Sequence, residues 1–305
     1  MNDLVTDVKT LELETIKNLK HSKAKNTVRA YESDFKDFSS FCVKNGLRAL
    51  PADPKILSLY LTYLSKKNKF STLKRRIASI KVVHKIKGHY LDAKHPIIME
   101  NLLGIKRING SYQISKKPLL INDIKLILKA LDIKEKKEYK RIRNKTLILV
   151  GFSGGFRRSE LIDLRIEDLE FVSEGVKIFI KRSKTDQSGE GSLKAIPYFD
   201  NEEYCPVKNL KKWIDYKKIQ NGKIFEIADK SVGLIIKKYA LHAGLDPSNY
   251  GGHSLRSGFA TSAAAAGAEE RNIMAMTGHK TTQMVRRYIN EANLFKNNAL
   301  NKIKF

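Results

Sequence analysis

The sequence predicts a mainly α, α+β protein in two parts: a helical amino-terminal domain and a larger mixed α/β domain with one small antiparallel sheet. Apolar residues recur at helical spacing along most of the chain, whereas the alternation typical of strands is confined to residues 176–199. A length of 305 residues suffices for two hydrophobic cores. We place the domains at 1–108 and 119–305, joined by a linker at 109–118 that mixes Gly, Ser, Lys and Pro.

Three helices are predicted in the first domain. Residues 26–43 carry one apolar stripe, formed by Val28, Tyr31, Phe35, Phe38 and Phe41. Asp53 followed by Pro54 is typical of a helix start, and Leu57, Tyr60, Leu61 and Leu64 then repeat at helical spacing. A third helix is expected to be capped by Ser71, with a core face of Leu73, Ile77, Ile80 and His84.

A basic flank of Lys74, Lys81 and Lys85 runs beside that third core face, with Arg75 and Arg76 near the start of the helix. A solvated lysine face is the ordinary interpretation of such a flank. Residues 65–107, however, hold twelve Lys or Arg against only two acidic residues. This shortage of acids favours a face that binds nucleic acid.

The second domain begins with helices predicted near residues 120–131 and 142–152. Val176, Ile178 and Ile180 then alternate with polar residues, and a turn-rich stretch leads into residues 193–199, which predicts a β-hairpin. From Val207 onward the pattern is helical again, with helices expected near 257–266, 269–276 and 282–288.

The charge of the chain predicts a polyanionic partner. Lys and Arg number 58 against 32 Asp and Glu, a formal net charge of +26. Residues 1–115 contribute +12 and the remainder +14, so both halves are basic. Because such an excess destabilises the compact state by self-repulsion, we expect a phosphate backbone gripped by two lobes.

The same sequence excludes several other classes of protein. No apolar run approaches the roughly 18 residues of a membrane span, and the first residues are too acidic for a signal peptide. Only two cysteines exist, Cys42 and Cys205, so neither a disulfide framework nor a thiolate metal site is expected. We therefore expect a cytoplasmic protein.

Four short motifs carry residue types that suit chemistry on phosphate. Residues 154–161, GGFRRSEL, place Arg157, Arg158 and Glu160 at a helix start, where amide groups and guanidinium charge coincide. The hairpin turn carries Lys184, which can contact a phosphate or donate a proton. Each motif alone is weak, since a surface turn or a solvated hairpin accounts for it equally well.

The other two motifs lie further along the chain. In GGHSLRSGF, His253 and Arg256 are three positions apart and share one helix face, although His253 alone is explained equally well as a helix cap. In TGHKTTQMVRRYIN, His279 follows a glycine turn and Tyr288 lies beside Arg286 and Arg287.

The order Arg, Lys, His-x-x-Arg, Gly-His, Tyr in one basic domain resembles the catalytic domain of the tyrosine recombinase (phage integrase) family. The resemblance spans residues 118–295, and the helical first domain resembles the SAM-like core-binding domain of that family. It implies six catalytic residues: Arg157, Lys184, His253, Arg256, His279 and Tyr288. Arg158 adjoins Arg157, but the spacing to Glu160 favours Arg157 as the family arginine.

The resemblance also implies a mechanism and partners. Tyr288 attacks the scissile phosphate of double-stranded DNA and forms a 3′-phosphotyrosyl link. Arg157, Arg256 and His279 stabilise charge on the phosphate, His253 assists proton transfer from Tyr288, and Lys184 protonates the leaving oxygen. Glu160 orients a neighbouring residue. No metal or nucleotide cofactor is expected, because the guanidinium groups supply the positive charge and the phosphotyrosyl link keeps the energy needed for rejoining.

The oligomer and the biological role are left more open. In this family the carboxy-terminal segment is exchanged between protomers to link a tetramer on two DNA sites, and here it carries Leu294, Phe295, Leu300 and Ile303. Packing of these residues on their own domain is the alternative. The short stretch before the first helix resembles Xer-like members without an arm-binding domain. Resolution of replicon dimers, integration of a mobile element, relaxation of supercoils, and regulation without catalysis are the roles to distinguish.

Overall fold

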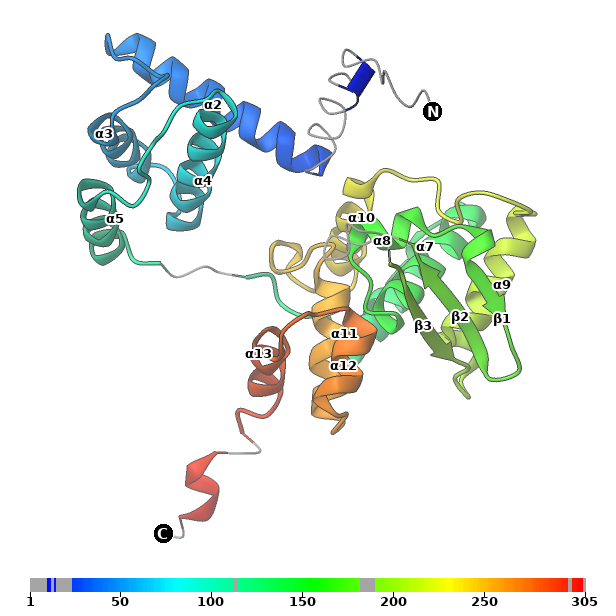
Figure 1. Ribbon diagram of the computed structural model, residues 1–305. Coiled ribbons are helices and arrows are strands. Elements are labelled where there is room, and N and C mark those ends of the chain that lie inside the picture. The colour runs from blue at the N-terminus through cyan, green and yellow to red at the C-terminus, as the bar shows by residue number, and fades with distance from the viewer. Residues whose placement is uncertain are drawn as a thin grey trace, which may run out of the picture. The chain divides into compact units, whose positions relative to one another are not determined.

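The computed structural model describes residues 10, 11, 14, 24–111, 115–181, 190–295 and 298–303. The chain divides into two compact units, Met1–Ile114 and Ser115–Phe305 (Figure 1). The described residues are mostly helical and include one three-stranded antiparallel sheet, which confirms the predicted mainly α, α+β class. Within these residues, no helix has the length and apolar character needed to cross a membrane.

Unit 1 is built from four described helices: α2 (Lys25–Lys44), α3 (Pro54–Ser65), α4 (Phe70–Ile86) and α5 (Pro96–Asn109). The buried face of α2 packs Phe38 of that stripe and, one turn later, Cys42 against α3 and α4 in one core, where both side chains are fully buried. The start of α3 is as predicted, because the Asp53 carboxylate accepts a hydrogen bond of 2.6 Å from the Lys55 amide.

Two predictions for unit 1 are wrong in detail. Ser71 is not a cap, because α4 begins at Phe70 and Lys69 occupies the N-cap position without a side-chain bond. The prediction of three helices is also incomplete, since a fourth, α5, continues to Asn109. Leu102 and Ile105 are buried on its inner face, so they pack in the core of unit 1.

His84 is a structural residue of unit 1. Its Nε2 atom accepts a hydrogen bond of 2.9 Å from the Ala52 amide, while Nδ1 lies 2.8 Å from the Ile80 carbonyl and donates to it. The ring is fully buried, and burial lowers its pKa. A neutral imidazole therefore joins α4 to the turn before α3.

The basic flank of α4 is only partly free to bind a ligand. Arg76 forms ion pairs with Asp34 and Asp37 of α2, and Arg75 also pairs with Asp34. Lys81 and Lys85 remain exposed. That the flank faces nucleic acid stays a prediction, and the two arginines near its start also hold α4 against α2 inside unit 1.

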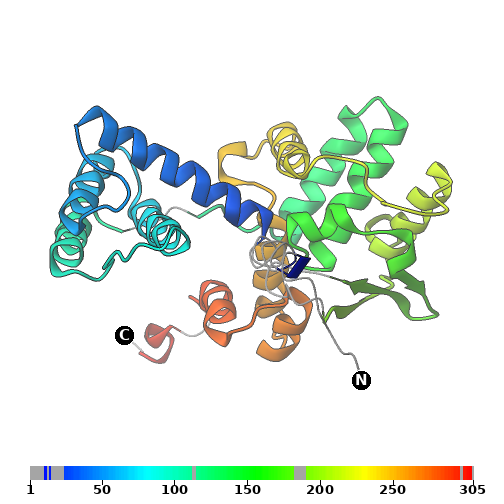
Figure 2. The same cartoon turned by 45° about the horizontal axis from the view of Figure 1, so that its top comes forward.

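The sheet of unit 2 consists of β1 (Leu169–Phe171), β2 (Gly175–Ile180) and β3 (Ser192–Pro197), in that order and antiparallel. The predicted hairpin is β2–β3, where Ile178 pairs with Lys194. The sheet lies at one side of the unit, next to α9 (Pro206–Lys217), as both ribbon views show (Figures 1 and 2). The three-residue strand β1 was too short to be predicted from alternation.

Four further helices of unit 2 pack around one large core: α6 (Ile121–Lys134), α7 (Glu138–Ser153), α8 (Arg158–Asp163) and α10 (Asp229–His242). Helix α11 (Ser254–Ala265) joins this core through Leu255 and forms a second, smaller cluster with α12 (Glu270–Thr277) and α13 (Thr282–Ala292). Gly258 of α11 lies against the Leu119 backbone, since a Cβ atom there would be 1.9 Å from the Leu119 carbonyl oxygen. The chain entering unit 2 is held at the same place, because the Leu119 amide donates to the Ser254 carbonyl.

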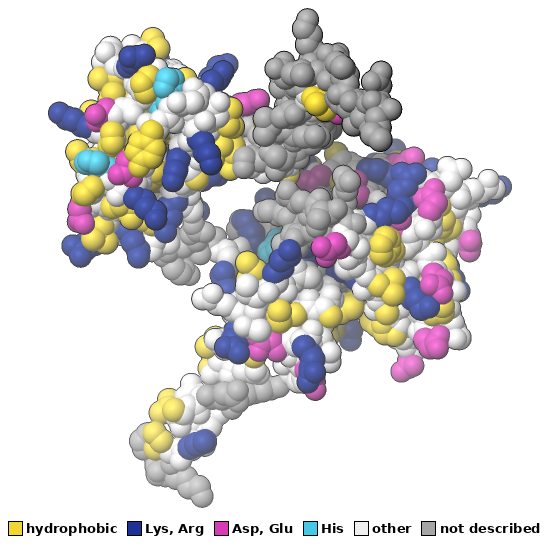
Figure 3. Space-filling view, in the orientation of Figure 1, with side chains coloured by type: hydrophobic (Ala, Val, Ile, Leu, Met, Phe, Trp, Pro, Cys, Tyr) yellow, Lys and Arg dark blue, Asp and Glu magenta, His cyan; other side chains and the backbone are white. Residues whose placement is uncertain are grey.

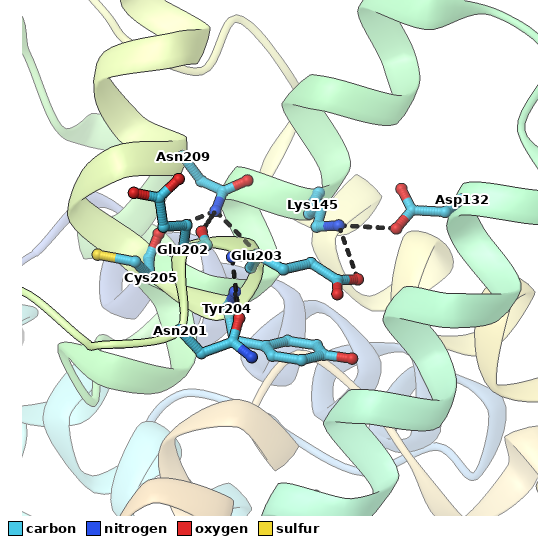
Figure 4. A network of polar contacts seen from close by, with 8 residues as sticks. All are labelled: Asp132, Lys145, Asn201, Glu202, Glu203, Tyr204, Cys205 and Asn209. Carbon is cyan, nitrogen blue, oxygen red and sulfur yellow. Dashed lines mark hydrogen bonds and ion pairs between the residues drawn. The ribbon is translucent and has the colours of Figure 1, made fainter.

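A polar network ties α6, α7 and α9 together at the surface of unit 2 (Figure 4). Lys145 of α7 lies 2.7 Å from an Asp132 carboxylate oxygen of α6 and 3.5 Å from Glu203. Asn209 of α9 donates to the carbonyls of Glu203 and Cys205. The polar groups of this network bind one another, so we interpret it as holding these helices together.

Candidate active site

Arg157 is held rigidly at the start of α8. The chain leaves α7 through Gly154 and Gly155, and Gly155 adopts a left-handed φ of +54° that favours glycine. The Arg157 amide and its guanidinium both donate to the Glu160 carboxylate, at 2.9 and 2.6 Å. Its other terminal nitrogen donates to the Gly278 carbonyl at 3.0 Å. Arg157 is therefore oriented on one side by Glu160 and on the other by the Gly278 carbonyl, in the turn after α12.

Arg158 lies in a different environment from its neighbour. Its guanidinium pairs with the Asp229 carboxylate at 2.6 Å, and the side chain is 44% exposed, against 17% for Arg157. The two adjacent arginines thus point to different partners, and only Arg157 contacts the turn that carries His279.

Arg256 lies almost fully buried beside Arg157, with 1% of its surface exposed. It donates to the Gly155 carbonyl at 2.9 Å. Burial and the Arg157 charge lower its pKa to about 10, while the Glu160 carboxylate offsets part of this effect. Two neighbouring guanidinium groups, of which only Arg157 is bonded to the Glu160 carboxylate among the described residues, form a site suited to an anion.

Tyr288 and His253 lie side by side near these arginines. The Tyr288 hydroxyl is 3.4 Å from Nε2 of His253. His253 occupies the N-cap position of α11, but its side chain makes no capping bond, so the cap interpretation does not hold. Burial and the two arginine charges lower the pKa of His253, and burial raises that of Tyr288. Both groups are therefore neutral at neutral pH, and His253 can accept a proton.

His279 completes the cluster. Gly278 ends α12 with a left-handed φ of +61°, and the His279 ring follows directly. Its Nδ1 atom lies 2.7 Å from the Thr277 hydroxyl, and its ring centroid is 5.9 Å from that of Tyr288. Burial and the charges of Arg256 and Arg157 lower its pKa to about 4, so the ring is neutral unless an anion is bound.

Five of the six predicted site residues thus lie in one region of unit 2, and the sixth cannot be placed. Lys184 belongs to residues 182–189, which lie outside the described residues. Its neighbour Lys181 is described, and its ammonium group lies 2.5 Å from the Asp168 carboxylate.

Sequence reasoning missed two residues of this region. Lys194 of β3 is 4% exposed and donates to the carbonyls of Gly154 and Met276, which lie three residues before Arg157 and His279 respectively. The available signal was the two-residue spacing to Ile196: side chains two positions apart share one face of a strand, and both are buried here. Thr277, which holds His279, has no such signal.

The carboxy-terminal segment exposes the apolar side chains singled out in the sequence. Leu294, Phe295, Leu300 and Ile303 are 63%, 86%, 61% and 53% exposed. By contrast, Val285 of α13 is fully buried against α11 and α12, and Tyr288 and Ile289 pack beside it. The alternative that the four residues pack on their own domain is therefore wrong for this structure.

Comparison with known proteins finds relatives for both units of the chain. Residues 118–294 match the model of the phage integrase family, and residues 16–89 match the phage integrase, N-terminal SAM-like domain. An integrase/recombinase xerD homolog of Selenomonas ruminantium is 41% identical over 96% of this chain and 89% of its own length. Tyrosine recombinase XerC of Leptospira interrogans is 25% identical over 87% of this chain and 83% of its own.

Two solved structures show the same fold. The integrase of transposon Tn1549, in complex with transposon right end DNA, has a TM-score of 0.63 and 16% identity over 92% of this chain and 97% of its own. The XerH site-specific recombinase, bound to a palindromic difH substrate after cleavage, has a TM-score of 0.60 and 20% identity over 81% and 73%.

Proposed function

The chain belongs to the phage integrase family of tyrosine recombinases, and we propose that it cuts and rejoins DNA strands at specific sites through a covalent bond to Tyr288. The observation that carries this proposal is the 3.4 Å contact of the Tyr288 hydroxyl with His253, next to the guanidinium groups of Arg157 and Arg256. A nucleophile, a proton acceptor and two fixed cations are the parts that a phosphoryl transfer needs.

The first chemical step uses the neutral states of the two rings. His253 accepts the proton of the Tyr288 hydroxyl as the phenolic oxygen attacks phosphorus in line. A bond from the tyrosine oxygen to phosphorus forms, and the bond from phosphorus to the 5′ oxygen breaks. The strand end stays attached as a 3′-phosphotyrosyl ester, and the leaving oxygen takes a proton from Lys184. Attack by another 5′-hydroxyl reverses the step and rejoins strands without a nucleotide cofactor.

The cations act on the non-bridging oxygens of the same phosphate. Arg157 and Arg256 present planar donors whose positions are fixed by Glu160 and by the Gly155 and Gly278 carbonyls. Donors held in place before the reaction need no reorganisation when charge develops. His279 contributes a further donor, because a bound phosphate anion raises the pKa of a ring that is otherwise neutral.

Double-stranded DNA is the proposed substrate. The net charge of +26 is spread over both units, and Lys and Arg side chains are visible over the face of each in Figure 3. Of the proteins that share the fold, the Tn1549 integrase is described in complex with transposon right end DNA and XerH bound to a palindromic difH substrate. Phosphate contacts from both units account for the excess of basic residues.

We further propose that the protein acts as a tetramer on two DNA sites, linked through its carboxy-terminal segment. The exposure of Leu294, Phe295, Leu300 and Ile303 supports this, because these four apolar side chains find no cover among the residues that the structure describes. A second copy of the protein provides the cover that the segment lacks.

Covalent trapping with sequencing of the attached DNA tests the function directly. The protein is incubated with fragments of genomic DNA and denatured, and the DNA that remains bound to it is sequenced. We expect one recurrent site, attached at a 3′ end and recovered only when Tyr288 is present. Supercoil relaxation without strand exchange between two duplexes would indicate a relaxase instead, and recovery of no attached DNA would indicate a non-catalytic DNA-binding protein.

A further inference from the structure

Lys194 is a buried cation that the mechanism above does not use. It lies on the inner face of β3, paired with Ile178 of β2, and is 4% exposed. Its ammonium group donates to the Gly154 carbonyl at 2.8 Å and to the Met276 carbonyl, and it lies 4.5 Å from the centroid of the Phe156 ring. Two carbonyl oxygens and an aromatic face thus surround the charge.

The two carbonyls belong to the two turns that carry the proposed site. Gly154 immediately precedes Gly155, whose carbonyl binds Arg256, and lies three residues before Arg157. Met276 lies in the last turn of α12, two residues before Gly278, whose carbonyl binds Arg157. One ammonium group therefore bridges the backbone of the Arg157 turn and the backbone of the His279 turn.

The charge of Lys194 lies among other charges, which makes its burial costly. Glu160 attracts it, whereas Arg256 and Arg157 repel it, and it in turn acts on His279. Burial and this repulsion lower the pKa of Lys194 to about 7. An apolar side chain of similar length would fill the same space without the cost of burying a charge. What lysine adds at this position is therefore its two hydrogen bonds, to the Gly154 and Met276 carbonyls.

We propose that Lys194 is a positioning residue of the cleavage reaction, whose ammonium group joins the Gly154 and Met276 carbonyls and so sets Arg157 and His279 relative to one another. Because Lys194 lies on β3, it also fastens the β2–β3 hairpin to both turns. The proposal rests on the proposed function for its catalytic part, but the bridge between the two turns is a property of the protein without DNA.

The bridge is tested first in the absence of DNA. Hydrogen exchange is followed by mass spectrometry in the full chain for residues 151–157 and 274–279, in the wild type, Lys194→Met and Lys194→Arg. The matched control is Lys177→Met, a lysine of β2 that pairs with Glu170 at the surface. We expect Lys194→Met to speed exchange in both segments by about tenfold or more, while Lys194→Arg and the control leave it near the wild-type rate.

The catalytic part is tested on a nicked duplex carrying the site recovered by trapping, at pH 6, where the Lys194 ammonium group is charged. The affinity for the duplex and the single-turnover rate of covalent adduct formation are measured separately. Since a displacement of about 1 Å can cost ~10²-fold in rate, we expect Lys194→Met to lose about 100-fold in rate with affinity changed by less than about threefold. Lys194→Arg, which keeps a charge and several donors, should recover much of the rate.

Each outcome decides part of the proposal. Unchanged exchange in Lys194→Met would overturn the bridge, and faster exchange with an unchanged adduct rate would overturn the positioning role. Should Lys194→Met fail to fold, Lys194→Arg decides: a folded arginine variant that loses about 100-fold in rate also overturns the proposal. Absence of any adduct in the wild type would refute the proposed function instead, and the exchange result would still decide the bridge.

Discussion

The Tyr288 hydroxyl lies 3.4 Å from Nε2 of His253, although the two residues are 35 positions apart in the chain. Helix packing brings them together, because α13 buries Val285 against Ala260 and Ala264 of α11, and His253 immediately precedes α11. The same apolar contact therefore positions the proposed nucleophile next to its proton acceptor.

The pH dependence of cleavage follows from the lowered pKa of His253. His253 accepts a proton only in its neutral form, and burial with two nearby arginines keeps it neutral below its ordinary pKa of 6.5. On the acid side we expect the adduct rate to decline only below pH 6.5, whereas loss of the Lys194 charge lowers the rate as the pH rises above about 7. Rate–pH profiles of single-turnover cleavage check this, and an acid limb with its midpoint above pH 6.5 would contradict the role of His253.

The two adjacent arginines should differ sharply in their effect on cleavage. Arg157→Ala removes a donor fixed by Glu160 and Gly278, and we expect the adduct rate to fall by ~10²–10³-fold. Arg158→Ala removes an exposed partner of Asp229 and should leave the rate within about threefold. Single-turnover assays on one duplex compare them, and a larger loss for Arg158→Ala would reverse the assignment.

Binding to DNA should depend steeply on salt. If both units neutralise many phosphates, counterion release lowers affinity by ~10³-fold or more between 50 and 200 mM salt. Fluorescence anisotropy of a labelled duplex with Tyr288→Phe measures binding without cleavage. A nearly flat dependence on salt would argue against phosphate contacts from two basic units.

The carboxy-terminal segment should matter for assembly and not for binding of a single site. Phe295→Ser combined with Leu300→Ser changes two exposed side chains, so folding stability should shift by less than about 0.5 kcal/mol each. We expect affinity for one site to persist and complexes of two duplexes to be lost, as measured by mass photometry. Leu234→Ser, an equally exposed change on α10, is the matched control. Complexes that form normally in the double variant would refute the linkage.

Regular patterns made much of the fold predictable. Two of these patterns are periodic faces, the phenylalanine spacing of α2 and the alternation of Val176, Ile178 and Ile180, and each packs toward the core of its own unit. The third is the Asp53-Pro54 start of α3, which reflects a side-chain cap. Helix α5 was missed because exposed Ile97, Met99 and Leu103 blur the pattern of its buried residues. Strand β1 has only three residues, which is too few for alternation to show.

The site was predictable in residue types but not in contacts. The order of motifs marks Arg157, His253, Arg256, His279 and Tyr288, because these residues carry the chemistry. The groups that hold them cannot be found in this way. Glu160 lies within the motif, but the Gly278 carbonyl, Thr277 and Lys194 reach the site only through folding of segments far apart in the chain.

Substitution of Tyr288 tests the central claim most directly. Tyr288→Phe removes the hydroxyl and keeps the ring, and Tyr216→Phe, an exposed tyrosine of α9 stacked on Trp213, is the control. Adduct formation is read from denaturing gels of a nicked duplex carrying the trapped site, and duplex affinity is measured in parallel. We expect no adduct with Tyr288→Phe, affinity within about threefold of the wild type, and normal cleavage by the control. A covalent adduct formed by Tyr288→Phe would contradict the central claim.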